Sequence, residues 1–266
     1  MTDRRTFPHG RPSSMPVRRR PQLLLLLTAA FVAGTALLPP GVVAAAPLRA
    51  DVLGGGVTIV PGRSGLVEIS GYRGAALPAG SALRLTAPAG ARVTGTPLAD
   101  TARFEGSVTA DGASGTYTYV RDSGAGSWKD SGYPFALTVD ERAVPGTRLP
   151  GCVAVLTDAG GVRRATGGCT VTVGMPVPTL GEPAGGTFVS GAARIAGTSY
   201  PGARVSVMDA AEGKVCGGVT RADGTWSCTP SSPLPSGANR LHASAAFNGV
   251  SAVGEDVDFT VTARTA

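Results

Sequence analysis

The sequence predicts an all-β protein with two consecutive antiparallel β-sandwiches behind an N-terminal export signal. This prediction rests on the pattern of apolar residues, on the turn-forming residues and on the cysteines. Short segments of alternating apolar and polar residues recur along the chain, turn-forming residues separate them, and four cysteines fall two in each half. Alternation with a turn roughly every ten residues is typical of antiparallel sandwiches, because one face of each strand is buried and tight turns join neighbours.

The first 45 residues have the organisation of a secretory signal peptide. Arg18–Arg20 precede an apolar run that begins at Leu23, and small residues follow it up to Ala45. A basic start, an apolar middle and a small-residue end direct a chain across a membrane and are then removed. We expect cleavage after Ala45, with an uncleaved N-terminal anchor as the alternative. The apolar run itself is short for a membrane span, and no membrane span is expected in the mature chain.

Removal of this segment changes the charge of the chain. The whole sequence carries a formal net charge of +6, but six of its 24 basic residues and one of its 18 acidic residues precede Ala46. The mature chain therefore holds 18 basic and 17 acidic residues, a net charge of +1. Nucleic-acid binding is not expected, because it requires a basic surface.

The strands are expected in ten segments rich in valine and threonine, residues that suit a half-buried pleated surface. The segments are 57–60, 66–70, 83–87, 116–120, 135–139, 152–156, 169–173, 204–210, 240–247 and 257–263. Between them lie many of the 39 glycines and 21 prolines of the chain. These residues favour tight turns, so this composition fits a folded sandwich rather than a disordered chain.

A proline-rich stretch, GMPVPTLGEPAGG, divides the strands into two groups. Proline cannot donate to a sheet ladder and fixes φ, so the stretch should be extended. We expect a β-sandwich domain over 51–174, a linker or first edge strand over 175–185, and a second sandwich over 186–264. Both groups end in a similar hairpin whose last strand contains a Thr-Val-Thr motif.

The four cysteines are expected to form two structural disulfides, Cys152–Cys169 and Cys216–Cys228. An even number of cysteines in an exported chain favours disulfides, and one pair in each half is the simplest connectivity. A turn at Gly160-Gly161 would place the first two cysteines directly opposite each other across a hairpin. The second pair surrounds a turn centred on Ala222, and we expect it to staple another hairpin with a looser register.

No metal site, cofactor or catalytic set is predicted, so the protein is not expected to be an enzyme. Cys-x-x-Cys pairs are absent, and the mature chain holds one histidine, His242, expected on the outer face of a strand. Asp209, Glu212 and Asp223 flank turns but do not have the spacing of a calcium-binding loop.

The second half resembles the bacterial immunoglobulin-like repeat of secreted and surface proteins, over about residues 178–263. The matching features are the pattern G-x-x-x-P-G-A-x-V-x-V from Gly197 to Val207, the turn from Ala222 to Ser227, and a Pro-Leu-Pro-Ser-Gly corner. The first half is similar to such sandwiches only in general. The resemblance implies an immunoglobulin-like fold used as a spacer, a stalk, or an adhesive or recognition module. Together with the strand pattern and the signal peptide, it leads us to expect two tandem immunoglobulin-like antiparallel β-sandwich domains after a cleaved signal peptide.

The leading functional hypothesis is a secreted or cell-envelope protein, without catalytic activity, that binds, adheres or acts as a spacer. Its partner would be an unidentified extracellular protein, or a polysaccharide of the cell wall or the environment. A first alternative is a carbohydrate-binding module that uses exposed rings of Trp128, Tyr117, Tyr119 and Tyr133. The same rings could instead form the core. The core is the preferred interpretation for the tyrosines, and both interpretations remain open for Trp128.

A second alternative is a secreted protease inhibitor, because disulfide-stapled loops suit that role. The presented loop would then be LPGC at 149–152 or YPGA at 200–203.

Trp226 occupies the turn-to-strand position of the immunoglobulin-like repeat and is expected in the core.

Overall fold

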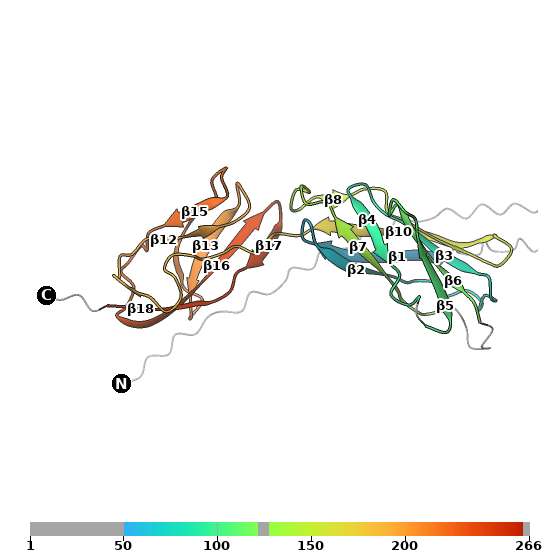
Figure 1. The fold of residues 1–266 in the computed structure, drawn as a ribbon, viewed down its shortest axis with the longest axis horizontal. Coiled ribbons are helices and arrows are strands. Elements are labelled where there is room, and N and C mark those ends of the chain that lie inside the picture. Colours follow the sequence, from blue (N-terminus) through green and yellow to red (C-terminus); the bar gives the residue numbers. More distant parts are fainter. Residues whose placement is uncertain (1–50, 100, 122–127, 263–266) are drawn as a thin grey trace, which may run out of the picture. The chain divides into compact units, whose positions relative to one another are not determined.

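The computed structural model describes residues 51–99, 101–121 and 128–262, and their regular structure consists of β-strands alone. The all-β prediction is therefore confirmed. The strands fall into two regions with separate hydrophobic cores, the first from β1 to β10 and the second from β11 to β18 (Figure 1). The predicted signal peptide lies outside the described residues. Within the described ranges, no helix is long and apolar enough to cross a membrane.

The first region is built from two sheets. Its strands are β1 (Asp51–Ile59), β2 (Ser64–Ile69), β3 (Ala82–Thr86), β4 (Ala91–Gly95), β5 (Phe104–Val108), β6 (Ser114–Tyr119), β7 (Tyr133–Val139), β8 (Arg148–Leu149), β9 (Val153–Thr157) and β10 (Arg163–Val173). One sheet has the order β1-β10-β9-β3-β6-β5, with β8 paired to β10, and the other has the order β2-β7-β4.

The core of the first region follows from the period-two alternation of its strands. In β7 the side chains of Tyr133, Phe135, Leu137 and Val139 are buried, and the residues between them are partly exposed. Successive side chains of a strand point to opposite faces, so one face of β7 packs into the core. A row of apolar residues at every second position therefore determines which face of the sheet is buried.

A close backbone contact joins β1 to β10. The two strands are parallel, with Asp51–Ile59 in register against Ala165–Val173. A Cβ atom added at Gly167 would collide with the backbone carbonyl of Leu53. Glycine is therefore required at position 167 for the two strands to approach this closely.

The second region also has two sheets. Its strands are β11 (Phe188–Val189), β12 (Ile195–Thr198), β13 (Arg204–Asp209), β14 (Lys214–Val219), β15 (Thr225–Cys228), β16 (Gly237–Phe247), β17 (Val250–Val253) and β18 (Val257–Val261). The larger sheet has the order β11-β18-β16-β13-β14, with β17 paired to β16, and β12 pairs with β15 in the smaller one.

Both regions close in the same way. The first strand of each region pairs in parallel with its last strand, β1 with β10 and β11 with β18, whereas the other ladders between described strands are antiparallel. The two Thr-Val-Thr motifs noted in the sequence lie in β10 and at the end of β18, and both receive this parallel partner. Each of the antiparallel sandwiches expected from the sequence thus contains one parallel ladder, because the first and last strands of each region lie side by side.

The proline-rich stretch predicted as a linker or edge strand adds hydrogen bonds to β12. The N–H of Thr179 donates to the carbonyl of Thr198 at 2.9 Å, and the N–H of Gly181 donates to that of Ala196 at 2.9 Å. Met175 is buried in the second core. The stretch thus has the character of an edge segment of the second region, while the domain boundaries themselves stay predictions.

Candidate functional site

The first disulfide, Cys152–Cys169, forms as predicted, with 5.2 Å between the two Cα atoms. The turn that brings the cysteines together differs from the prediction. Asp158 N donates to the carbonyl of Val162, and the φ of Gly161 is +79°, so the turn between this hydrogen-bonded pair holds three residues, 159–161, rather than two. A shift of one residue in the ladder, between Arg163 and Ala165, then restores the register in which the two cysteines face each other.

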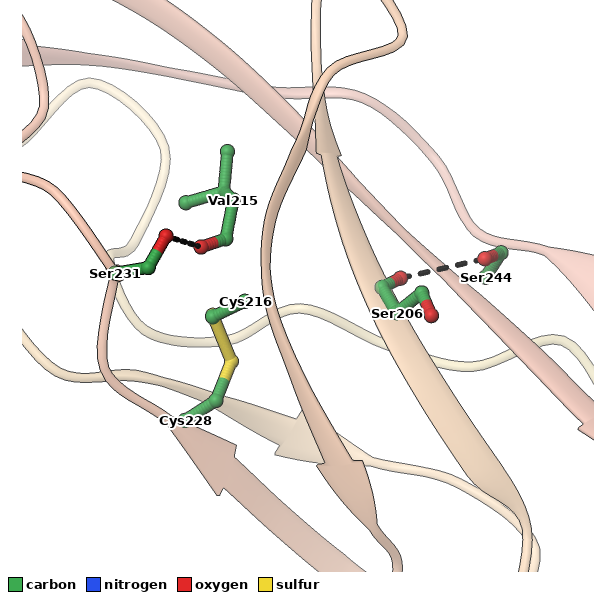
Figure 2. Close-up of a disulfide and its surroundings, with 6 residues drawn as sticks. All are labelled: Ser206, Val215, Cys216, Cys228, Ser231 and Ser244. Carbon is green, nitrogen blue, oxygen red and sulfur yellow. Dashed lines mark hydrogen bonds between the residues drawn. A yellow bond between two sulfur atoms is a disulfide. The ribbon is translucent and has the colours of Figure 1, made fainter.

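The second disulfide, Cys216–Cys228, also forms as predicted, but it does not staple a hairpin. Cys216 lies in β14 of the larger sheet, and Cys228 lies at the end of β15, which pairs with β12 in the smaller sheet. Figure 2 shows the sulfur bridge between these two strands. The prediction of a stapled hairpin is wrong, because β15 leaves β14 after the Arg221–Thr225 turn to join the opposite sheet. The disulfide therefore connects the two sheets across the second core.

Hydrogen bonds from two serines lie near this bridge. Ser231 Oγ donates to the carbonyl of Val215 at 3.3 Å, which holds the segment after β15 against β14 (Figure 2). On the neighbouring pair of strands, Ser244 Oγ donates to the carbonyl of Ser206 at 3.3 Å. Both serine hydroxyls donate to backbone carbonyls, so these hydrogen bonds hold the strands around the disulfide in place.

The four aromatic residues considered as a sugar-binding platform are buried. Tyr117, Tyr119, Trp128 and Tyr133 have exposed fractions between 0% and 5%. They contact Phe104 or one another with ring centroids 4.7 to 6.2 Å apart. Burial also raises the pKa of the Tyr117 and Tyr133 hydroxyls. These four residues therefore do not form an exposed platform. Aromatic rings bury a large apolar surface and attract one another, which favours their shared place in the core.

Trp128 is held in place by polar contacts as well as by burial. Its indole Nε1–H donates to Ser81 Oγ at 2.7 Å, and its backbone N–H donates to the hydroxyl of Tyr133 at 3.0 Å. Its φ of +73° is unusual for a bulky residue. The predicted Gly/Ser-rich loop before it lies partly outside the described residues. Trp226 is buried as predicted, and its Nε1–H donates to the carbonyl of Thr198 at 3.1 Å.

His242 lies on the outer face of β16, as predicted, but acidic groups that the sequence did not place there are close to it. Its Nε2 lies 3.8 Å from Glu212 Oε2, and its Nδ1 lies 3.5 Å from Asp256 Oδ1. Both distances exceed those of a strong hydrogen bond, so the two carboxylates lie beside the imidazole without a close contact to it.

The acidic residues considered for calcium binding stabilise their own turns. Asp209 Oδ1 accepts hydrogen bonds from the N–H groups of Ala211 and Gly213, and Asp223 Oδ1 accepts two from Thr225. The backbone N–H of Thr225 is the main reason why the pKa of Asp223 is lowered. Across the described ranges, no group of three or more His, Cys, Asp or Glu residues could hold a metal ion.

The two stretches considered as inhibitor loops are tied to their surroundings. Leu149 is paired with Val171, and the carbonyl of Pro150 accepts a hydrogen bond from Ala89 N. In YPGA, the N–H of Ala203 donates to the carbonyl of Tyr200, whose ring packs against Phe247. Both stretches are short and hydrogen-bonded, with Pro150 and Pro201 exposed at their tips, and the inhibitor hypothesis stays a prediction.

Two depressions open on the surface of the first region. One, of about 580 Å³, lies beside β4 and β7, and all of its charged side chains are exposed. The other has a volume of about 690 Å³ and includes buried side chains in its wall. We call the second one the Tyr72 cleft. It is lined by Asp51, Tyr72, Gly74, Ala75, Ala76, Leu77, Pro78, Asp158, Ala159, Gly160 and Arg164. Buried Val139 lines the first depression as well, but the Tyr72 cleft also holds the hydrogen-bonded Tyr72 hydroxyl and the Asp158–Arg164 ion pair, so it is the better-built candidate site.

One wall of the Tyr72 cleft is the loop that connects β2 and β3. The hydroxyl of Tyr72 donates to the carbonyl of Ala75 at 2.8 Å, and Ser81 Oγ donates to the carbonyl of Pro78 at 2.7 Å. The carbonyl of Tyr72 accepts a hydrogen bond from Asp130 N at 3.0 Å. Tyr72 and Leu77 are buried beneath this loop, with exposed fractions of 5% and 8%. Hydrogen bonds within the loop and to Asp130, together with the buried side chains of Tyr72 and Leu77, therefore hold the apolar wall in place.

The opposite wall carries the charges. Arg164 Nε donates to Asp158 Oδ2 at 2.8 Å, and Asp158 Oδ1 accepts hydrogen bonds from Gly160 N and Val162 N. The N–H of Val162 is the main cause that lowers the pKa of Asp158, and Arg164 lowers it further. Asp51 Oδ2 accepts a hydrogen bond from Arg73 N at 3.0 Å.

The neighbouring charges and burial both affect the pKa of the Tyr72 hydroxyl. Burial is the main cause that raises the pKa of Tyr72, the Asp51 carboxylate raises it further, and Arg164 lowers it. The phenol thus lies near both an anion and a cation, and it remains the neutral donor that holds Ala75.

Sequence reasoning missed the Tyr72 cleft. Its residues come from the start of β1, the β2–β3 loop and the β9–β10 hairpin, which lie far apart in the sequence. One signal was available. The stretch GYRGAALPAG between two predicted strands lacks alternation and is longer than a tight turn. A loop of that length in a compact sandwich is often functional.

No family model matches this sequence, and no curated protein matches it. Three solved structures illustrate its similarities. The BSP domain of a biofilm-associated protein is 16% identical with a TM-score of 0.29, over 81% of this chain and 30% of that one. BcpA, the major pilin subunit of Bacillus cereus, is 12% identical with a TM-score of 0.32, over 77% of this chain and 65% of that one. A non-cellulosomal cohesin of the hyperthermophilic archaeon Archaeoglobus fulgidus is 16% identical with a TM-score of 0.28, over 46% of this chain and 90% of that one.

The described chain thus spans about a third of the length of the biofilm-associated structure and under two thirds of the pilin subunit. TM-scores this low carry no argument about family or function. The resemblance to the bacterial immunoglobulin-like repeat therefore stays a prediction.

Proposed function

We propose that the chain is an exported protein without catalytic activity, which binds or spaces partners outside the cytoplasm as a secreted or envelope-associated module. The observation that carries the proposal is the state of the cysteines. All four are paired, in two disulfides, and none is free. Structural disulfides form and persist in oxidising compartments and are rare in the cytosol.

Two features support a binding or spacer role. Each region buries its apolar residues in a core of its own, so a chain of two such regions suits a stalk or spacer. The Tyr72 cleft offers a concave surface with convergent polar groups, the usual form of a small-ligand site. The partner would be an extracellular protein or a polysaccharide.

The proposal is tested by export of the full chain in a bacterial host. We expect the chain to leave the cytoplasm with Ala46 as its first residue, as N-terminal sequencing would show. Its four cysteines should resist a thiol reagent until a reductant is added. A chain that stays in the cytoplasm with reactive thiols would contradict the proposal.

A further inference from the structure

We propose that the Tyr72 cleft binds one unit of a neutral sugar. This inference rests on the proposed function, because it supplies a ligand class for the site of an exported binding module. It also differs from the excluded aromatic platform, since the recognising groups are a carboxylate, a guanidinium group and an apolar wall.

The cleft has hydrogen-bonding groups that the described residues leave unused. Asp51 Oδ2 is occupied by Arg73 N, whereas Oδ1 accepts no hydrogen bond from any described residue. Arg164 uses Nε and Nη2 on Asp158, whereas its Nη1 has no partner within the described ranges. Among the residues that the structure describes, the cleft thus offers one acceptor and one donor edge without a partner. Hydroxyl groups both donate and accept, so neighbouring hydroxyls of one ring can satisfy both.

The charges of the cleft favour a neutral ligand. Two carboxylates, Asp51 and Asp158, face a single guanidinium group, Arg164. An anionic ligand would meet a net negative charge, and the Arg164 cation is already paired with Asp158. A cationic ligand could approach Asp51 but would be repelled by the neighbouring Arg164 guanidinium group and would not use its Nη1 donor. A neutral ligand with hydroxyl groups avoids both penalties.

The apolar wall of the cleft can be covered by one face of a sugar ring. Ala75, Ala76, Pro78 and Ala159 lie exposed around the buried ring of Tyr72. The C–H face of a sugar ring is apolar and can cover such a surface while its hydroxyls turn toward the opposite wall. The volume of about 690 Å³ is within the usual range for small-ligand sites. Because hydrogen bonds already hold the β2–β3 loop in place, little ordering is needed on binding.

The test is an NMR titration of the exported, disulfide-bonded chain with neutral methyl glycosides. Glucosamine and glucuronate serve as cationic and anionic probes of similar size. We expect a dissociation constant on the order of 1 mM for a matching glycoside, as for one small ring in an open cleft. The amide signals of Gly74, Ala76 and Gly160 should shift, and the charged probes should bind more weakly.

Three variants locate the site. Asp51→Ala should weaken binding about tenfold, because it removes a charged hydrogen-bond acceptor. Arg164→Lys retains the positive charge and removes the guanidinium fork, and it should also weaken binding. Asp140→Ala is the matched control, because it removes an exposed carboxylate from the other depression of the first region. Unchanged thermal unfolding of each variant would show that binding is lost without loss of the fold.

The source of the sugar is decided by a second measurement. Retention on insoluble chitin, cellulose or peptidoglycan, lost in Asp51→Ala, supports a sugar unit within a polymer. Binding of soluble glycosides alone supports a free sugar. The proposal is overturned if no glycoside shifts the cleft signals, if Asp51→Ala binds like the unmodified chain, or if glucosamine alone binds. An exported chain with unreactive cysteines that binds no glycoside would overturn this inference and leave the proposed function intact.

Discussion

The two regions share a closing arrangement of strands but differ in how their cores are held together. In the first region, Phe104 contacts four other rings, those of Tyr117, Tyr119, Trp128 and Tyr133, at 5.2 to 6.2 Å. In the second region, the buried core consists mainly of valine, leucine and alanine around Trp226 and Phe259. One pair of rings, Tyr200 and Phe247, is in contact among the described residues there.

The disulfides differ in a complementary way. Cys152–Cys169 joins two neighbouring strands of one sheet, which hydrogen bonds already hold together. Cys216–Cys228 joins two sheets that share no ladder. The comparison teaches that one fold plan can be stabilised mainly by ring packing or by a covalent link across a core of smaller side chains. Each region contains one tryptophan, so Trp128 and Trp226 can report the unfolding of the two regions separately.

The largest effect is expected from truncation of a core ring. Phe104→Ala should cost about 3–5 kcal/mol, because it removes a buried ring and leaves a cavity. Ring pairs add about 0.5–1.5 kcal/mol beyond burial, so Phe259→Ala, which loses no ring pair among the described residues, should cost less. Urea unfolding would be followed by Trp128 fluorescence in a Trp226→Phe background, and by Trp226 fluorescence in a Trp128→Phe background. Equal costs would show that the ring cluster adds nothing beyond burial.

Removal of the disulfides tests the covalent half of the comparison. The bridges span 17 and 12 residues, and loops of this size contribute about 3 kcal/mol each in the chain-entropy model. The paired substitution of Cys216 and Cys228 by alanine should lower the midpoint of the Trp226 transition more than the same change at Cys152 and Cys169 lowers that of Trp128. The reason is that only the former pair links two sheets. A larger loss in the first region would contradict the comparison.

The partners of the two indole N–H groups give a smaller contrast. Trp128 donates to the side chain of Ser81, whereas Trp226 donates to the backbone carbonyl of Thr198. Ser81→Ala should cost about 1–3 kcal/mol, because it leaves a buried donor without its acceptor. Thr198→Ala retains the carbonyl and is the matched control. If both variants unfold alike, the Ser81 hydroxyl is not the group that satisfies Trp128.

The smallest effect on stability is expected when the pH is lowered. Asp158 in the first region and Asp223 in the second have a lowered pKa, mainly through hydrogen bonds from backbone N–H groups of their own turns. A lowered pKa in the folded state means that ionisation stabilises the fold. That stability is present above the unfolded pKa of about 4 and is lost as pH falls through the lower folded value. Asp158→Asn and Asp223→Asn should each flatten the acid-side slope of one region, measured as unfolding midpoints between neutral and acidic pH. An unchanged slope in both variants would contradict this assignment.

The sequence was sufficient for the strands with strong alternation. Segments such as 135–139 and 240–247 were predicted because every second residue is apolar, and this local pattern determines both the extended conformation and the buried face. Strands of two residues, such as β8 and β11, are too short to show alternation and could not be found in this way. Their pairing depends on neighbours distant in the sequence.

The candidate site was beyond prediction for the same reason. Asp51, Tyr72 and Arg164 carry no local motif, and the cleft exists only because β1 returns to lie beside β10. The aromatic residues that drew attention in the sequence are core residues, since their exposure depends on what the rest of the chain places around them.

The sequence alone determined the all-β class, the division of strands and cysteines into two groups, and the correct disulfide partners. These depend on local periodicity, on turn-forming residues and on the number of cysteines. Only the tertiary structure decided that Cys216–Cys228 links two sheets, that Trp128 is buried, and that the Tyr72 cleft forms. Each of these depends on which sheet a strand joins, and that choice is made by the packing of residues far apart in the chain.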